Sequence, residues 1–149
     1  MTADVLLTEE YTLCRIEATS RKRVLEEIAN ALEQPELTSD ALFEGLMARE
    51  RLGSTGLGEG VAIPHCRADV DRITLCLATA REPIDYEASD GQFVDIFVAL
   101  IVPTDEHEAH LGILAELATA LNEPDNRNSL RACRSSSELC TCLKSMLNS

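Results

Sequence analysis

Four of the seven glycines in this 149-residue chain lie within eight residues, in the segment GSTGLGEG from Gly53 to Gly60. Such a density predicts a loop with a defined backbone shape, because glycine adopts conformations that cost other residues free energy. The loop runs directly into VAIPH, a short β-branched segment that Pro64 closes and His65 follows. Ligand crevices open at strand ends in α/β sheets, so His65 is a candidate functional residue.

Helices and strands alternate around this loop. Apolar residues recur at helical spacing on both sides of it, and the run at 93–102 is nearly continuous in apolar residues, as in a strand covered on both faces. The expected elements are strands at 13–18, 61–65, 73–79 and 93–102, and helices at 21–34, 40–51, 106–122, 126–131 and from about 136. This order predicts a single α/β domain over residues 1–149, with a small mixed β-sheet flanked by helices on both faces.

Several local details are predicted as well. Ser20 is the expected N-cap of the first long helix, and Thr38 or Ser39 that of the second. The connection EPIDYEASDGQ is expected to be a loop or a hairpin. The apolar stripe of the helix at 106–122 is predicted to consist of Leu111, Leu114, Leu117, Ala118 and Leu121.

The charge of the chain excludes several classes of function. Lys and Arg number 13 against 26 Asp and Glu, for a net charge of −13, which repels nucleic-acid backbones and anionic membranes. Aromatic residues make up 3% and tryptophan is absent, so a base-stacking surface is not expected. No apolar run approaches the roughly 18–20 residues of a membrane span, and the first residues, which have no basic region followed by an apolar one, are not expected to be a signal peptide. We therefore expect a cytoplasmic protein that is not membrane-embedded and does not bind nucleic acid.

The six cysteines, at positions 14, 66, 76, 133, 140 and 142, include no C-x-x-C pair. Without a secretory signal, these residues are expected to be buried or half-buried thiols in a reducing compartment. Cys140 and Cys142 lie two residues apart in an expected helix, where their side chains diverge and cannot share a metal.

The segment around the glycine loop is electrically neutral. Between residues 49 and 72, four arginines balance four acidic residues, so the remaining residues carry the whole net charge of −13. Ser54 and Thr55 add hydroxyls to the glycine backbone N–H groups, a combination that suits an anion such as a transient phosphoryl group. The alternative is a glycine-rich turn with a partly exposed histidine, and composition does not decide between the two.

Other enzyme motifs are missing or incomplete. His107 and His110 are spaced H-E-A-H rather than H-E-x-x-H, and no third ligand is evident, so no metal site is expected. His107 is expected to be solvated, and His110 to face inward at the sheet edge. Cys66 beside His65 suggests a Cys/His nucleophile, but neighbouring side chains usually point apart. The chain lacks a G-x-S-x-G elbow and a phosphate-binding G-x-x-x-x-G-K-[ST] loop.

The segment RERLGSTGLGEGVAIPHCR, from Arg49 to Arg67, resembles the type-2 IIA domain of the bacterial phosphoenolpyruvate-dependent phosphotransferase system. The resemblance covers essentially the whole chain, including the later segment VPTDEHEAHLGILAELATALN, and is strongest to the nitrogen-regulatory branch. By position, His65 matches the phosphorylated histidine, Arg49 the supporting arginine and His110 the second histidine of the site. One departure is Cys66, where the family usually has glycine or another small residue. Cysteine would add strain there if the position requires a positive φ.

The resemblance implies a phosphocarrier of the nitrogen-related phosphotransferase system. It would accept a phosphoryl group on His65 from an HPr-like phosphohistidine carrier and regulate target proteins by its phosphorylation state, with no cofactor and no metal. Catalysis would rest on His65, Arg49 and His110, with Ser54, Thr55 and Gly56 binding the phosphoryl group. The alternative is a sugar-transport IIA component that passes phosphate to a IIB domain. The regulatory target and the phosphorylated nitrogen stay open at this point.

Overall fold

The computed structural model describes residues 2–106 and 108–148. Its six strands are β1 (Thr12–Ile16), β2 (Gly56–Gly58), β3 (Val61–Ala62), β4 (His65–Ala68), β5 (Thr74–Ile84) and β6 (Val94–Pro103). Its helices are α1 (Ala3–Leu6), α2 (Arg21–Leu32), α3 (Ser39–Arg51), α4 (Ala109–Leu121), α5 (Pro124–Ala132) and α6 (Ser136–Leu147), with a 3-10 turn at Glu9–Tyr11.

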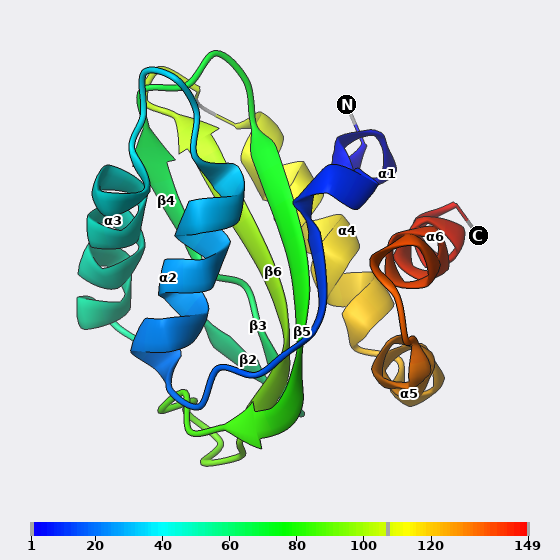
Figure 1. Ribbon diagram of the computed structural model, residues 1–149. Helices are drawn as coiled ribbons and strands as arrows, with labels where there is room; N and C mark the ends of the chain where they lie inside the picture. The colour runs from blue at the N-terminus through cyan, green and yellow to red at the C-terminus, as the bar shows by residue number, and fades with distance from the viewer. Residues whose placement is uncertain (1, 107, 149) are drawn as a thin grey trace.

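The strands form one mixed sheet in the order β1-β5-β6-β3-β2, and β4 also pairs with β6. β1 runs parallel to β5, and β3 and β4 run parallel to β6, whereas the β5–β6 and β2–β3 pairs are antiparallel. Helices α2 and α3 cover one face of the sheet, and α1, α4, α5 and α6 cover the other (Figure 1). The predicted fold class is confirmed.

Strand β6 supplies apolar side chains to both faces of the sheet. Ile96, Val98 and Leu100 belong to the core beneath α4, α5 and α6. Phe97, Ala99 and Ile101 alternate with them and belong to the core beneath α2 and α3. Because successive side chains of a strand point to opposite faces, a central strand buried on both sides is apolar at nearly every position. The prediction for this strand is confirmed.

The predicted helix starts are found with side-chain caps. The Ser20 hydroxyl accepts a hydrogen bond from the backbone N–H of Arg23, and the Thr38 hydroxyl accepts one from that of Ala41. Thr38 is therefore the cap of α3 and Ser39 its first residue. Each cap satisfies a backbone donor that the helix itself leaves without a partner.

The segment around the glycine loop differs from expectation. Part of it is a strand, since Gly56–Gly58 pairs with Val61–Ala62. His65 does not lie beyond a strand end but opens β4, opposite Leu100 of β6. β3 and β4 both pair with β6 and meet at Pro64, whose carbonyl accepts the backbone N–H of Leu100 at 2.9 Å. Proline has no backbone N–H to donate to a neighbouring strand. The chain therefore pairs with β6 as two short strands, β3 and β4, rather than as one continuous strand.

Two other predictions need correction. β5 continues to Ile84 through a register irregularity after Thr79, and so includes the start of the expected loop. α4 begins at Ala109 rather than 106, and its buried residues are Ile113, Leu117, Ala120 and Leu121. Leu111 is 56% exposed, so the predicted stripe combined two faces of this helix. Within the described part of the chain, no helix is long and apolar enough to cross a membrane.

Candidate functional site

A pocket of about 360 Å³ opens where β4 begins. It gathers five of the predicted site residues: Arg49 at the end of α3, His65, and the loop residues Ser54, Thr55 and Gly56. The remaining lining residues are apolar and come from β2, the β3–β4 junction and α4: Leu57, Ile63, Leu114, Ala115 and Ala118. The pocket is thus a small apolar recess with one imidazole and one guanidinium at its wall.

The imidazole of His65 is held by a neighbouring backbone group. Its Nδ1 lies 2.8 Å from the carbonyl oxygen of Ile63, two residues earlier. A carbonyl oxygen only accepts hydrogen bonds, so Nδ1 carries the proton of the neutral ring. Nε2 then keeps its lone pair, and a single local contact fixes both the tautomer and the orientation of the half-buried ring.

Arg49 lies in the last turn of α3, against the start of the glycine loop. Its Nη1 donates a hydrogen bond to the carbonyl oxygen of Gly53 at 2.7 Å. That contact holds the guanidinium in place, while the fork of the remaining N–H groups can serve an anion in the pocket.

The hydrogen-bond donors of Ser54, Thr55 and Gly56 bond to other groups of the protein. Thr55 donates its backbone N–H to Glu50 Oε1 at 3.1 Å and its hydroxyl to Glu50 Oε2 at 2.5 Å. Ser54 accepts the Gly56 N–H at 3.1 Å and donates to the Tyr86 carbonyl oxygen at 3.4 Å. These three residues line the pocket, but the described contacts direct their donors toward the protein.

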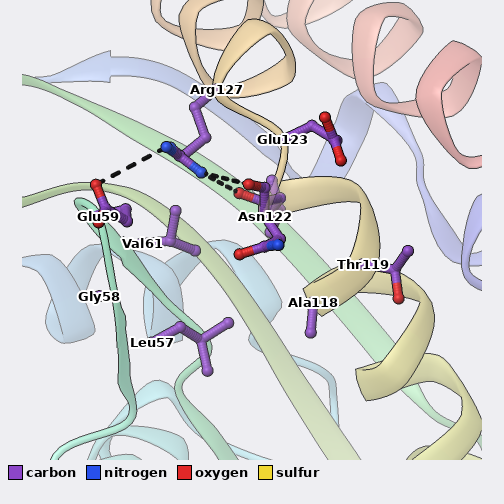
Figure 2. Close-up of a pocket in the computed structure, with 10 residues that line it drawn as sticks. Leu57, Gly58, Glu59, Val61, Ala118, Thr119, Asn122, Glu123 and Arg127 are labelled. Carbon is purple, nitrogen blue, oxygen red and sulfur yellow. Dashed lines mark hydrogen bonds and ion pairs between the residues drawn. The ribbon is translucent and has the colours of Figure 1, made fainter.

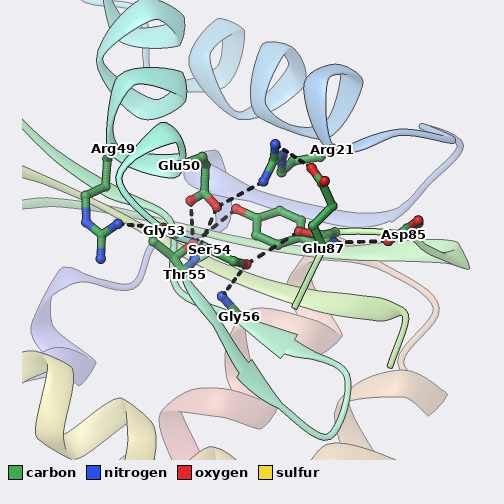
Figure 3. A network of polar contacts seen from close by, with 10 residues as sticks. Arg21, Arg49, Glu50, Gly53, Ser54, Thr55, Gly56, Asp85 and Glu87 are labelled. Atoms are coloured by element: carbon green, nitrogen blue, oxygen red, sulfur yellow. Dashed lines mark hydrogen bonds and ion pairs between the residues drawn. The ribbon is translucent and has the colours of Figure 1, made fainter. Parts of the chain in front are cut away.

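Glu50 is the centre of a buried polar network beneath the loop (Figure 3). Its side chain has 0% exposure, and the Arg21 guanidinium lies 3.8 Å from Glu50 Oε1 and 2.7 Å from Glu87. The Tyr86 hydroxyl lies 3.2 Å from the Thr55 hydroxyl, and Arg21 lies over the Tyr86 ring at 5.8 Å. Burial, and then the Glu50 charge, raise the pKa of Tyr86 well above its usual range.

Sequence reasoning missed this network, although one signal for it was present. Leu42, Leu46 and Glu50 are spaced by four residues and share the buried face of α3. A carboxylate on an otherwise apolar helix face needs buried partners, because an isolated buried charge is strongly unfavourable. Arg21 and Tyr86 come from distant segments, and only the fold brings them to Glu50.

His110 lies close to this pocket but does not line it. It occupies the first turn of α4, on the same helix face as Leu114 and Ala118, which do line the pocket. Its Nδ1 lies 2.7 Å from Glu106 Oε2, so the carboxylate orients the ring. His107, the other histidine of this segment, lies outside the described residues.

Glu106 also caps helix α4. Its Oε1 accepts the backbone N–H groups of Glu108 at 3.0 Å and Ala109 at 2.5 Å. Partial desolvation opposes ionisation of this carboxyl, but the hydrogen bonds from His110 and Ala109 outweigh it and lower the pKa of Glu106. Arg67 supports the same turn by donating to the carbonyl oxygens of Pro103 at 3.0 Å and Glu106 at 2.6 Å. These contacts explain why α4 begins three residues later than expected.

Cys66 fits its position without backbone strain. It lies in β4 and is not among the described residues with positive φ. A Cβ atom at Gly45 of α3 would lie 3.0 Å from the Cys66 sulfur, so a glycine on the helix makes room for the thiol. Burial raises the pKa of Cys66 to about 11, which keeps this thiol protonated rather than nucleophilic.

A second pocket, of about 440 Å³, continues from the first along α4 and shares Leu57 and Ala118 with it (Figure 2). At its far end Arg127 donates to the carbonyl oxygens of Leu121 at 3.0 Å and Asn122 at 2.9 Å. Leu57 is 53% exposed. The site therefore lies in a longer, partly apolar groove between α4 and the β2–β3 hairpin.

Residues 5–146 match the family described as "Phosphoenolpyruvate-dependent sugar phosphotransferase system, EIIA 2". The chain belongs to this family. EIIA components of this system transfer phosphoryl groups, accepting them from phosphocarriers and passing them on. The family suggested by the Arg49–Arg67 motif is thereby confirmed.

Three comparisons place this EIIA chain among its relatives. It is 42% identical over 130 residues to a nitrogen regulatory protein of Pseudomonas aeruginosa, covering 85% of this chain and 84% of the relative. It is 38% identical over 137 residues to a nitrogen regulatory protein of Escherichia coli, covering 90% of this chain and 84% of that relative. The crystal structure of the nitrogen regulatory protein IIA-Ntr of Neisseria meningitidis superimposes with a TM-score of 0.88 at 36% identity, covering 97% of each chain.

Proposed function

We propose that this protein is a phosphocarrier of the nitrogen-related phosphotransferase system. It accepts a phosphoryl group on His65 from an HPr-like phosphohistidine carrier, and its phosphorylation state determines which regulatory proteins it binds. The observation that carries the proposal is the contact between His65 Nδ1 and the Ile63 carbonyl at 2.8 Å. It leaves Nε2 as the nucleophilic atom in a pocket that also contains Arg49.

In the proposed reaction, the lone pair of His65 Nε2 attacks the phosphorus of the donor phosphohistidine in line. The new N–P bond forms as the donor's P–N bond breaks, and the donor ring leaves with that electron pair as a neutral imidazole that keeps the proton on its other nitrogen. Nδ1 of His65 keeps its proton, and the product ring carries the charge that the Ile63 carbonyl stabilises. Such a transfer depends mainly on positioning and charge stabilisation.

Arg49 is the proposed clamp on the phosphoryl oxygens. A guanidinium binds two oxygens with parallel N–H groups, which an ammonium group imitates poorly. His110 is the proposed second donor, from the helix face that continues into the pocket wall. Because its Nδ1 faces Glu106, it would donate through Nε2 as an imidazolium paired with that carboxylate. Both residues would favour the transition state electrostatically.

Ser54, Thr55 and Gly56 are proposed to act through the shape of their loop. Because the Thr55 N–H and hydroxyl both donate to Glu50, the direct phosphoryl contacts expected for Thr55 would require these bonds to break. The Glu50 network instead holds the loop against Arg49 and His65. Thr55 and Glu50 are therefore positioning residues in this proposal.

The proposed docking surface for the donor surrounds the pocket. Three leucines are exposed: Leu52 at 85%, Leu57 at 53% and Leu111 at 56%. Leu52 follows the last residue of α3, Leu57 lies in β2 and Leu111 lies in α4. Exposed leucines of this kind are typical of the centre of a protein–protein interface, where they exclude water from the groups they surround. A dry interface protects a phosphohistidine from hydrolysis during transfer.

The nitrogen-regulatory role is supported by the identities of 38–42% with proteins of that name. The alternative, a sugar-transport IIA component, is supported by 30% identity over 128 residues to the fructose-specific EIIABC component of Bacillus subtilis, of which the match covers 20%. We also propose that residues 1–149 work as one EIIA domain in the cytoplasm, where its six free cysteines would stay reduced.

The deciding experiment incubates the protein with phosphoenolpyruvate and the host's first enzyme and HPr-like carriers. Intact mass should rise by one phosphate of about 80 Da, and His65→Ala should show no increase. A second incubation adds purified fructose-type IIB domain. Phosphate retained on this chain supports the regulatory role, whereas rapid loss to IIB supports transport. No phosphate on the wild-type chain would contradict both.

A further inference from the structure

The turn that joins β2 to β3 has a backbone shape that depends on its surroundings. Its residues Gly58, Glu59 and Gly60 all have positive φ, at 96°, 57° and 84°. Glycine adopts such values readily, whereas Glu59 is one of three non-glycine residues with positive φ among residues 2–106 and 108–148. A non-glycine residue keeps this conformation only where the structure around it holds it there. The contacts of the turn therefore determine its shape.

Three other parts of the chain hold the backbone of this turn. The Glu59 N–H donates to Asp90 Oδ2 at 3.0 Å, in the segment between β5 and β6. The Gly60 carbonyl oxygen accepts the backbone N–H of Asp95 at 3.0 Å, in β6. The Glu59 carbonyl oxygen accepts a hydrogen bond from Arg131 Nη2 at 3.0 Å, in α5. Elements that are distant in the sequence thus meet at one short turn.

Arg131 joins two of these parts. Its Nε lies 3.0 and 2.9 Å from the two carboxylate oxygens of Asp95, while its Nη2 donates to the Glu59 carbonyl oxygen. The Arg131 and Asp95 side chains are 33% and 16% exposed, so water screens their pairing only in part. A Cβ atom on Gly60 would overlap Arg131 Nη2, so the guanidinium occupies the space that this glycine leaves. A planar guanidinium can serve both acceptors at once, which an ammonium group cannot.

The turn lies directly after Leu57, the residue that β2 contributes to the proposed docking surface. Leu57 is 53% exposed and lines both the His65 pocket and its continuation along α4 (Figure 2). His65 is positioned by other contacts, namely its pairing with β6 and its hydrogen bond to the Ile63 carbonyl oxygen. A change at the turn should therefore affect Leu57 more than the reacting imidazole.

We infer that Arg131 and Asp95 are positioning residues for docking of the phosphoryl donor. They hold the turn so that Leu57 is in place before the HPr-like carrier binds. This inference rests on the proposed function. A contact that is ordered before association costs less conformational entropy when the complex forms. Arg131 and Asp95 are not among the residues that line the His65 pocket, so they act through Leu57 and not on the phosphoryl group.

The test measures the steady-state rate of transfer from the phosphorylated HPr-like carrier to the full chain. Arg131→Ala should raise the KM for the carrier at least about 5-fold and change kcat less than about 2-fold, which is the pattern of lost binding. Phosphorylation by phosphoramidate, a small donor that needs no docking, should stay within about 2-fold of the wild-type rate. Arg134 is exposed and follows the end of α5, so Arg134→Ala is the matched control and should keep the wild-type KM.

Further variants separate positioning from a general effect on the fold. Arg131→Lys keeps the charge but serves one acceptor, so its KM should lie between those of wild type and Arg131→Ala. In a double-mutant cycle, Arg131→Ala should raise the KM of Leu57→Ala less than about 2-fold. Hydrogen exchange over residues 56–62 should be faster in Arg131→Ala than in wild type, with exchange in β1 unchanged. If circular dichroism shows that Arg131→Ala is unfolded, Asp95→Asn takes its place and should raise the KM in the same way.

Several results would overturn the inference. One is a folded Arg131→Ala protein with the wild-type KM, and another is an increase in KM that multiplies fully with that of Leu57→Ala. An equal loss of rate with phosphoramidate would show that the arginine affects the chemistry and not docking. If the wild-type chain accepts no phosphate from the carrier, the proposed function fails and this inference fails with it. Normal wild-type transfer with an unchanged KM in the variants would contradict this inference alone.

Discussion

The Nδ1 atom of His65 lies 2.8 Å from the carbonyl oxygen of Ile63, so one backbone acceptor determines which ring nitrogen is free. Phosphorylation is therefore expected at Nε2. Long-range nitrogen–proton correlation of the phosphorylated, ¹⁵N-labelled protein identifies the nitrogen bonded to phosphorus. A phosphoryl group on Nδ1 would mean that the Ile63 contact breaks before transfer and does not select the nucleophile.

Arg49 is expected to be needed as a guanidinium, not as a positive charge. Arg49→Lys should reduce the rate of phosphoryl transfer about 10-fold or more, because the ammonium group loses the two-point contact. The melting temperature should change little. Arg51, two residues later and exposed, is the matched control, and Arg51→Lys should transfer at the wild-type rate. Equal losses in the two variants would indicate a general charge effect.

Thr55 is expected to act through Glu50. Thr55→Val leaves one Glu50 oxygen without its hydroxyl donor and should lower the free energy of unfolding by about 2 kcal/mol, with slower phosphorylation. Thr55→Ser should restore most of both. In a double-mutant cycle with Glu50→Gln, the two losses should be strongly non-additive. Additive losses in transfer rate would instead point to a direct contact between Thr55 and the phosphoryl group.

His110 is expected to increase the rate without being the acceptor. His110→Ala should still take phosphate on His65, but about 10-fold more slowly, since one charge-assisted donor is lost. Glu106→Ala should give a smaller loss of the same kind, because the carboxylate holds the His110 ring at 2.7 Å. The exposed Glu108 offers the control variant Glu108→Ala. Wild-type transfer by His110→Ala, in a quench-flow assay, would remove His110 from the site.

Tyr86 makes a specific prediction for alkaline stability. Burial, followed by the Glu50 charge, raises its pKa in the folded state above the unfolded value of about 10. Above pH 10 the unfolded chain therefore loses a proton that the folded chain keeps, and stability falls by up to about 1.4 kcal/mol per pH unit from this group. Urea titrations between pH 8 and 11 should show a shallower fall for Tyr86→Phe than for wild type. Identical slopes for the two proteins would contradict the assignment.

The sequence predicted the fold because its signals were local or periodic. Ser20 and Thr38 are chemically suited to cap helices, and the apolar run of β6 required cover on both faces. The family motif predicted that Arg49 and His65 belong to one site. The sequence did not predict β4, because its pairing with β6 depends on the course of the chain after Pro64.

The supports of the site were harder to predict than its reacting groups. Glu50 meets Thr55 five residues away, but its other partners, Arg21 and Tyr86, come from α2 and the segment after β5. Likewise, the stripe predicted for α4 contained residues of two faces, because periodicity alone does not say which face meets the sheet and which meets the pocket. Such contacts depend on tertiary packing rather than on local pattern.

The pairing of β4 with β6 has a consequence for how a phosphorylated form could be recognised. His65 is bound into the sheet opposite Leu100, and the Pro64 carbonyl beside it accepts the Leu100 N–H. The backbone at the reactive residue therefore has no hinge. Phosphorylation would place a phosphoryl group with nearly two negative charges, partly offset by the charged ring, at an almost immobile point on a chain that already carries −13. A partner that distinguishes the two forms would then respond to the change in charge at His65 rather than to a change in backbone conformation. A binding protein with a carboxylate facing His65 would prefer the unmodified form.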